Sequence, residues 1–284
     1  MDIHAIINPA SGSVPADGEA ALAAALEELG HEAQIAMVEP DNLVGQAQEI
    51  AEQQTDLIIA WGGDGSCAAT LQAVADTGVP VLVLPGGTMN VLHRQVHGEV
   101  LDWNVCLRRA LTAGETRPLV AGRANDRLFY VMTIVGHVAG LAAPRELLRE
   151  GKGIKALQQL TEKPILDVEP ALSLQSSNQH DKALNDDVSC VFISLSDYLP
   201  DAFEIAVLKP ESPAGLVGQS IGMAVSSLLD REDSERHYAE RLTVTPLVDG
   251  GVDVTFDGEP SRLHEKTVVS FIPDAATVLA IPHD

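Results

Sequence analysis

Short apolar stretches alternate with amphipathic ones over the first third of the chain. The apolar stretches are rich in β-branched residues and cover residues 4–7, 32–38, 56–61 and 79–84, as expected of strands buried on both faces of a sheet. Between them, residues 19–29 place three leucines on one helical stripe, with Asp17 as the N-cap and Gly30 as the C-terminal stop. Residues 41–53 and 66–76 are also predicted helices. This alternation predicts an α/β domain with a parallel sheet, whose functional loops lie at the carboxyl ends of the strands.

The pattern changes near residue 119, where short strand candidates separated by polar or Gly/Pro turns take over. The strand candidates cover residues 128–135, 171–175, 188–195, 203–208, 242–247, 251–256 and 267–272. Helices are predicted over residues 143–160 and 213–229, and an exposed loop over 176–187. We therefore expect an α/β domain over residues 1–118 and a β-rich domain over 119–273.

Composition excludes several classes of protein. The formal net charge of −23 argues against a broad electrostatic grip on nucleic acid, which needs basic surface. The three cysteines, Cys67, Cys106 and Cys190, are too few and too widely spaced for a disulfide framework or a structural zinc site. We find no pattern of a secretory signal or a membrane span, so the expected location is the cytoplasm.

Basic residues are missing from the whole amino-terminal segment. Residues 1–93 contain thirteen acidic residues and neither Lys nor Arg, and the first basic side chain is Arg94. If this segment binds a nucleotide, its phosphates must be held by backbone N–H groups, helix dipoles and a divalent metal. A Walker-type P-loop, which needs a lysine, is excluded here.

Three Gly-rich or polar loops each follow a predicted strand: residues 8–12 (NPASG), 62–66 (GGDGS) and 85–90 (PGGTMN). In a parallel sheet all three emerge at one edge. The glycines of the second loop predict an anion-binding nest with positive φ values that opens a helix at Ser66. Asp64 would repel a phosphate unless it holds a metal, contacts a bridging water or faces a sugar hydroxyl. Tight strand-to-helix turns also explain any one such loop.

These loops, in this order and spacing, resemble the diacylglycerol kinase catalytic domain family, which includes bacterial soluble lipid kinases and sphingosine kinases. Residues 257–260 (DGEP) are similar to a motif in the second domain of that family, so the resemblance spans essentially the whole chain. NAD kinases share only the GGDG portion. The resemblance implies a Rossmann-like α/β nucleotide domain, a β-sandwich-like second domain, a last strand (277–281) that returns to the first domain, and ATP and lipid meeting in the cleft.

The resemblance also assigns roles to residues. Glu259 would be the general base that takes the proton of the substrate hydroxyl, Asp64 would position Mg²⁺, and Asp257 would organise metal or water. Since Asp-Gly is a turn signal, residues 257–259 are either a hairpin turn or a strand segment with both carboxylates on one face. For Arg94, contact with phosphate and pairing with a surface acid both stay open. The residues expected to bind ATP are Asn8, Pro9, Ser11, Gly12, Gly62, Gly63, Asp64, Gly65, Ser66, Thr88, Asn90 and Arg94.

Two positions depart from the family pattern. Val91 stands where the family commonly has Asp, which removes an acidic group from the nucleotide edge. Ala202 replaces a Gly in a stretch that binds a structural Mg²⁺ in some members; the ligands here would be Asp201 and the carbonyls of Tyr198 and Phe203.

Residues 141–163 hold five of the chain's eighteen basic residues, interleaved with apolar ones. Such a segment either lies on an anionic membrane surface or forms an amphipathic helix packed on its own domain. The expected function is an ATP- and Mg²⁺-dependent kinase of a diacylglycerol-like lipid, with peripheral membrane contact. The alternatives are a kinase of a soluble alcohol and a catalytically silent nucleotide-binding regulatory protein. A homodimer stays open.

Overall fold

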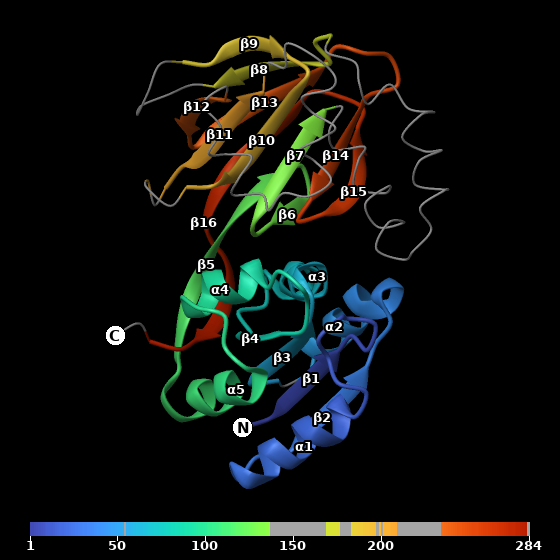
Figure 1. The fold of residues 1–284 in the computed structure, drawn as a ribbon, viewed down its shortest axis with the longest axis vertical. Coiled ribbons are helices and arrows are strands. Elements are labelled where there is room, and N and C mark those ends of the chain that lie inside the picture. Colours follow the sequence, from blue (N-terminus) through green and yellow to red (C-terminus); the bar gives the residue numbers. More distant parts are fainter. Residues whose placement is uncertain are drawn as a thin grey trace. The chain divides into compact units, whose positions relative to one another are not determined.

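Strands and helices alternate through the first part of the computed structural model (Figure 1). The structure describes residues 1–53, 55–136, 169–176, 183–196, 199, 201–208 and 234–282. The strands are β1 (Ile3–Ile7), β2 (Ala33–Met37), β3 (Leu57–Gly62) and β4 (Val81–Pro85). The helices are α1 (Gly18–Glu28), α2 (Leu43–Ala51, after a 3₁₀ turn at Pro40–Asn42), α3 (Asp64–Val74), α4 (Val91–His97) and α5 (Trp103–Ala113).

The strands of this region form the predicted parallel sheet, in the order β2-β1-β3-β4-β16. Strand β1 pairs in parallel with β2 and β3, and β3 pairs in parallel with β4. The last strand, β16 (Thr267–Ala280), joins through a parallel pairing of Val278 with Val81. The carboxyl ends of β1, β3 and β4 therefore lie at one edge of the sheet, as the sequence predicts.

Helices cover both faces of the sheet, which explains why its strands are almost wholly apolar. Alternate residues of β1, β3 and β4 pack with α1 and α5 in one core cluster. Trp61 belongs to that cluster; its ring centroid lies 4.5 Å from that of Trp103, and its indole N–H donates to the Pro85 carbonyl at 3.1 Å. Trp61 is therefore an ordinary core residue at the end of β3.

The second part of the chain is made of strands: β5 (Glu115–Ala124), β6 (Arg127–Phe129), β7 (Met132–Gly136), β8 (Leu172–Ser176), β9 (Asn185–Val188), β10 (Cys190–Leu195), β11 (Phe203–Leu208), β12 (Ser234–Ala239), β13 (Arg241–Pro246), β14 (Val252–Phe256) and β15 (Glu259–Leu263). One antiparallel sheet has the order β12-β11-β10-β7-β14-β15, and β8, β9, β13 and the first part of β16 form antiparallel pairs in the other. Side chains of both sheets share one core cluster. The predicted sandwich-like second domain is confirmed.

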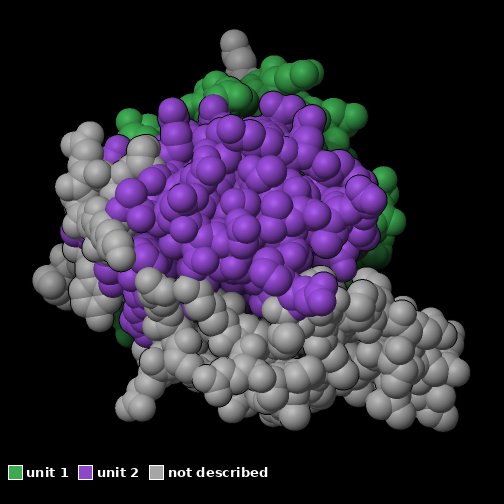
Figure 2. All heavy atoms as spheres, turned by 90° about the horizontal axis from the view of Figure 1, so that it is seen from above, with its two compact units in different colours: residues 1–121, 273–284 green, residues 122–272 purple. Residues whose placement is uncertain are grey.

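By its internal packing the chain divides into two units, residues 1–121 with 273–284 and residues 122–272 (Figure 2). Several local predictions differ from the structure. Helix α3 begins at Asp64 rather than Ser66, and residues 267–280 form one strand rather than two. The expected loop over 176–187 ends in strand β9 from Asn185. The predicted helices over 143–160 and 213–229, and the basic segment 141–163, lie outside the described residues.

Candidate functional site

Side-chain hydroxyls and an amide join the three predicted loops at the carboxyl edge of the first sheet. Asn8 donates through Nδ2 to Ser66 Oγ at 2.8 Å, which links the first loop to helix α3. Ser11 Oγ accepts a hydrogen bond from the Gly63 N–H at 3.0 Å. Ser13 Oγ donates to the Gly87 carbonyl at 2.9 Å, which links the first loop to the third. The predicted meeting of the loops therefore occurs, and polar side chains fix it.

The glycines of the second and third loops allow their backbones to touch. A Cβ on Gly87 would lie 2.8 Å from Gly63 Cα, and one on Gly86 would lie 2.8 Å from both Cα and O of Gly62. None of the glycines in residues 62–65 has a positive φ, since the positive-φ glycines of the described chain lie elsewhere. The positive φ values predicted for this nest are therefore wrong. Gly86 and Gly87 of the third loop need to be glycine because that loop packs directly against the backbone of the second.

Asp64 begins helix α3 and connects it to the next helix. Its Oδ1 accepts a hydrogen bond from the Leu92 N–H, in the first turn of α4, at 2.8 Å. A carboxylate in that position satisfies an amide that the helix leaves without a partner and offsets the positive end of the helix dipole. Asp64 thus has a structural role that the sequence did not predict, and its second carboxylate oxygen is left for another ligand.

The third loop turns at Asn90, whose φ of 49° lies in the left-handed region that Asn tolerates. Its side chain accepts from the Gly87 N–H at 2.8 Å and donates to the Gly87 carbonyl at 3.0 Å, so it closes the loop rather than facing a ligand. Thr88 is exposed, and a Cβ on the exposed Gly12 would lie 3.8 Å from its Oγ1. These two positions form the open part of the edge.

The remaining residues that were predicted to bind ATP differ in how exposed they are. Pro9 is exposed and Gly65 is partly exposed in the first turn of α3. Arg94 is exposed on α4, and among the described residues its guanidinium makes no ion pair. The pairing of Arg94 with a surface acid therefore finds no support in the described part of the chain.

The carboxylate of Asp257 is held by main-chain amides. Its oxygens accept hydrogen bonds from the N–H groups of Tyr130 at 2.7 Å, Val131 at 2.8 Å and Met132 at 2.9 Å. Asp257 and Gly258 form the two-residue turn between β14 and β15, with Glu259 as the first residue of β15. The strand interpretation, with both carboxylates on one face of a single strand, is therefore wrong, and the hairpin-turn interpretation is correct.

Asp201, the predicted ligand of a structural Mg²⁺, is exposed just before β11. The neighbouring turn is closed by its own hydrogen bonds: the Ser196 N–H donates to the Ala202 carbonyl at 3.1 Å, and the Leu199 N–H donates to Ser196 Oγ at 3.0 Å. Tyr198, whose carbonyl was expected to be a ligand, lies outside the described residues. The predicted ion site therefore stays a prediction.

Helices α4 and α5 bring together a cluster that the sequence analysis missed. The ligand atoms of His93, His97 and Cys106 lie within 4.8 Å of one another, and all three side chains are buried. His93 Nδ1 and His97 Nε2 both contact the Val83 carbonyl, at 2.9 and 3.0 Å, and their other ring nitrogens accept from the N–H groups of Leu101 and Ile281 at 3.3 Å. Each imidazole is thus fully hydrogen-bonded in its neutral form.

Burial favours the uncharged forms of two groups in this cluster, His93 and Cys106. Desolvation lowers the pKa of His93 and raises the pKa of Cys106 to about 12. The cluster is therefore a polar network that ties β4, α4 and the end of the chain together, and its hydrogen bonds leave no free ring nitrogen for a metal. The spacing of His93 and His97, four residues apart on one helix, is the sequence signal that could have revealed it.

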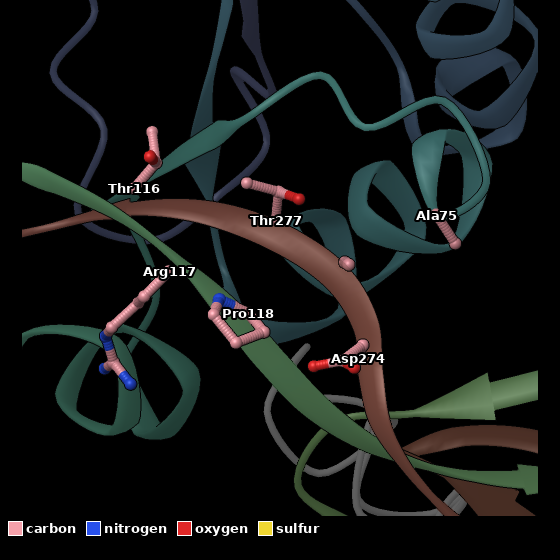
Figure 3. A pocket seen from close by; sticks show the side chains of 7 residues that line it. Ala75, Thr116, Arg117, Pro118, Asp274 and Thr277 are labelled. Atoms are coloured by element: carbon pink, nitrogen blue, oxygen red, sulfur yellow. The ribbon is translucent and has the colours of Figure 1, made fainter.

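A shallow pocket of about 330 Å³ lies at the other end of α3 from the loops (Figure 3). Ala75 follows the last residue of α3, and β5 and β16 supply the rest of the lining, including Arg117 and Asp274. The Arg117 guanidinium donates to the carbonyl oxygens of Gln95 at 3.3 Å and Val96 at 2.7 Å near the end of α4. This arginine therefore stabilises a helix end, and the pocket is not part of the loop edge.

The arrangement is that of an α/β domain with three loops gathered at the carboxyl edge of a parallel sheet, the edge at which such folds bind their ligands. Residues 2–124 match the family model described as the diacylglycerol kinase catalytic domain. The resemblance inferred from the motifs is therefore confirmed for this segment, and its match to a kinase family supports a phosphotransferase.

Solved structures match over nearly the whole chain. A proposed diacylglycerol kinase from Bacillus anthracis str. Sterne gives a TM-score of 0.72 at 20% sequence identity, over 99% of this chain and 97% of that chain. A diacylglycerol kinase from the same organism gives 0.70 at 19% identity, with the same coverage. At these identities the likeness establishes the two-part fold. Within the described residues, none of the helices has the length and hydropathy needed to cross a membrane.

Proposed function

We propose that this protein is a kinase that transfers the γ-phosphoryl group of ATP to a hydroxyl of a diacylglycerol-like lipid, with Mg²⁺ as the metal. The observation that carries the proposal is the hydrogen-bonded set of three loops at one sheet edge, inside the segment that matches the diacylglycerol kinase catalytic domain. The kinase family implies ATP as co-substrate. The lipid class rests on the family description and on the names of the similar structures.

Backbone amides do most of the phosphate binding in this proposal. Gly63, the N-cap of α3, has no side chain to offer the amides of the first turn. The N–H groups of Asp64, Gly65 and Ser66 are therefore available to phosphate oxygens, and the α3 dipole favours the negative charge. Because residues 1–93 contain no Lys or Arg, this contribution replaces that of a P-loop lysine.

The predicted metal ligands differ in how well they suit Mg²⁺. Asp64 uses Oδ1 for the Leu92 N–H and keeps Oδ2 for the metal or a bound water. Asp257 uses both oxygens for backbone amides, so it does not fit a metal-ligand role. When bound, Mg²⁺ neutralises charge on the phosphoryl group being transferred. Glu259, exposed at the start of β15, accepts the proton of the lipid hydroxyl; this role comes from the DGE resemblance.

Transfer of labelled phosphate tests the proposal. The purified protein is incubated with γ-labelled ATP, Mg²⁺ and three acceptors: diacylglycerol in vesicles, sphingosine in vesicles, and glycerol in solution. We expect label on diacylglycerol. Glu259→Gln should abolish transfer while ATP affinity, measured by calorimetry, stays within about twofold of wild type. Glu265→Gln, an exposed Glu in the same unit, is the matched control and should transfer normally.

Other outcomes would favour the alternatives. Label on glycerol but on neither lipid would indicate a kinase of a soluble alcohol. ATP binding without transfer to any acceptor would indicate a catalytically silent nucleotide-binding protein. Two observations favour that second candidate: Val91 lacks the family's carboxylate, and Asp257 is occupied by backbone amides.

A further inference from the structure

The tip of the β14–β15 hairpin is tied to a backbone segment far away in sequence. Asp257 and Gly258 both have positive φ values, 50° and 91°, which defines a type I′ turn. Gly is the expected residue at the second position of such a turn, and both Asn and Asp are common at the first. The turn itself therefore does not explain why residue 257 is Asp rather than Asn.

The contacts of the carboxylate do explain it. The segment between β6 and β7 presents three consecutive N–H groups, those of Tyr130, Val131 and Met132, and all three donate to Asp257. Tyr130 and Met132 are buried, so their amides need a partner inside the protein. A carboxylate accepts all three because it has only acceptors, whereas an amide side chain would turn an NH₂ group toward one of the donors. The Asp257 N–H donates in return to the Met132 carbonyl at 2.8 Å.

This clamp sits two residues before Glu259. Among the described strands, β15 is the edge of its sheet and pairs with β14 alone, so no second strand of the described chain fixes it near the turn. Phe256 lies opposite Glu259 in the pairing, and the Arg127 guanidinium lies 5.0 Å from the centre of its ring. The β14 side of the turn is thus held against β6 and the start of β7, and Glu259 follows directly after the turn.

We propose that Asp257 is a positioning residue for Glu259: its carboxylate fixes the hairpin tip on the amides of residues 130–132, and it does not bind the metal. This role rests on the proposed function only because Glu259 is the base in that function. The clamp, which is the set of hydrogen bonds from residues 130–132 to Asp257, does not depend on it. A misplacement of about 1 Å at a reacting group costs roughly 100-fold in rate. The loss of the clamp should therefore lower kcat and leave the KM for ATP and the Mg²⁺ requirement unchanged.

Asp257→Asn is the decisive variant, because Asn also favours the type I′ turn and replaces one accepting oxygen of the carboxylate with an NH₂ group. We expect hydrogen exchange of the amides of residues 130–132 and of β15 to accelerate by roughly tenfold or more. We expect kcat to fall about 100-fold, with the KM for ATP and the half-saturating Mg²⁺ concentration within about twofold of wild type. Asp257→Ala, which removes every acceptor, should exchange faster still.

Asp253→Asn is the matched control. Asp253 lies on the same hairpin, and its Oδ1 is 3.2 Å from Arg262 NH1, so this variant should leave exchange at residues 130–132 and kcat as in wild type. A tenfold higher Mg²⁺ requirement in Asp257→Asn, with exchange unchanged, would overturn the proposal and make Asp257 a metal ligand. Faster exchange at 130–132 without any change in β15 would overturn it too.

The exchange measurements need no kinase activity. If the wild type transfers no phosphate to any acceptor, the proposed function fails, and exchange in Asp257→Asn still decides whether the carboxylate holds β15 in place. If Asp257→Ala does not fold, the exchange rates of Asp257→Asn are sufficient to decide the proposal.

Discussion

The contact between the second and third loops of the α/β unit can be tested with one methyl group. A Cβ on Gly87 would lie 2.8 Å from Gly63 Cα, where ordinary contact begins at 3.4 Å. The neighbour is backbone, and it belongs to the residue that precedes helix α3. Gly87→Ala therefore requires the two loops to separate by about 0.6 Å, the difference between those distances. Gly87 has no positive φ, so steric overlap is the only penalty.

Overpacking of this kind costs about 1–3 kcal/mol in free energy of unfolding. The displaced atoms include the N-cap of α3, whose first-turn amides are the proposed phosphate donors. Gly87→Ala should thus lower stability by about 2 kcal/mol and weaken ATP binding at least about tenfold, which corresponds to about 1.4 kcal/mol.

Gly45→Ala is the matched control, because Gly45 lies inside α2 and a Cβ there meets nothing within 4 Å. That variant should gain up to about 1 kcal/mol from helix propensity and bind ATP as wild type does. Urea denaturation and calorimetry with ATP measure both quantities. If Gly87→Ala unfolds at the wild-type urea concentration and binds ATP normally, the close backbone approach is not what requires glycine there.

Three further predictions concern titration, reactivity and capping. Burial lowers the pKa of His93, so the unfolded chain takes up a proton at a higher pH than the folded protein does. In urea denaturation, stability should therefore fall as pH drops below about 6.5, by at most about 1.4 kcal/mol per pH unit from this group, and His93→Gln should reduce this dependence. Since burial raises the pKa of both Cys67 and Cys106 to about 12, a thiol reagent at pH 8 should label them only after unfolding; rapid labelling of either in the native protein would contradict their burial. Asp64→Asn keeps an acceptor for the Leu92 N–H, so its free energy of unfolding should lie within about 0.5 kcal/mol of wild type, whereas that of Asp64→Ala should fall by about 1 kcal/mol. Equal losses of both variants in urea denaturation would show that Asp64 does not cap α4.

Sequence patterns were most informative where structure is local. The apolar stretches predicted β1 to β4 to within two residues at each end, because buried parallel strands leave no polar positions. The helix at Trp103–Ala113 was missed, although Asp102 caps it by accepting from the Asn104 N–H at 2.9 Å. An N-cap residue followed by apolar positions is a signal that the sequence does contain.

In strand β16, pairing with other strands outweighs the local tendency of a proline to interrupt a strand. The sequence analysis predicts two strands here, over residues 267–272 and 277–281, and Pro273, which has no N–H to donate, lies between them. In the structure the residues before it pair with β13 up to Ser270, and Val278 after it pairs with β4. Pro273 is exposed and stands between these pairings, a position in which a strand tolerates proline.

The class of fold, the three loops at one edge and their likeness to a kinase family could all be predicted from the amino-acid sequence, since they depend on periodicity and on the spacing of short motifs. The contacts of individual site residues could not be predicted and are seen in the folded chain. Gly87 needs its hydrogen because Gly63 lies against it, and Asp257 needs its charge because three amides some 125 residues earlier converge on it. Such contacts join segments distant in the chain, and the identity of a single residue does not specify which distant atoms will meet it.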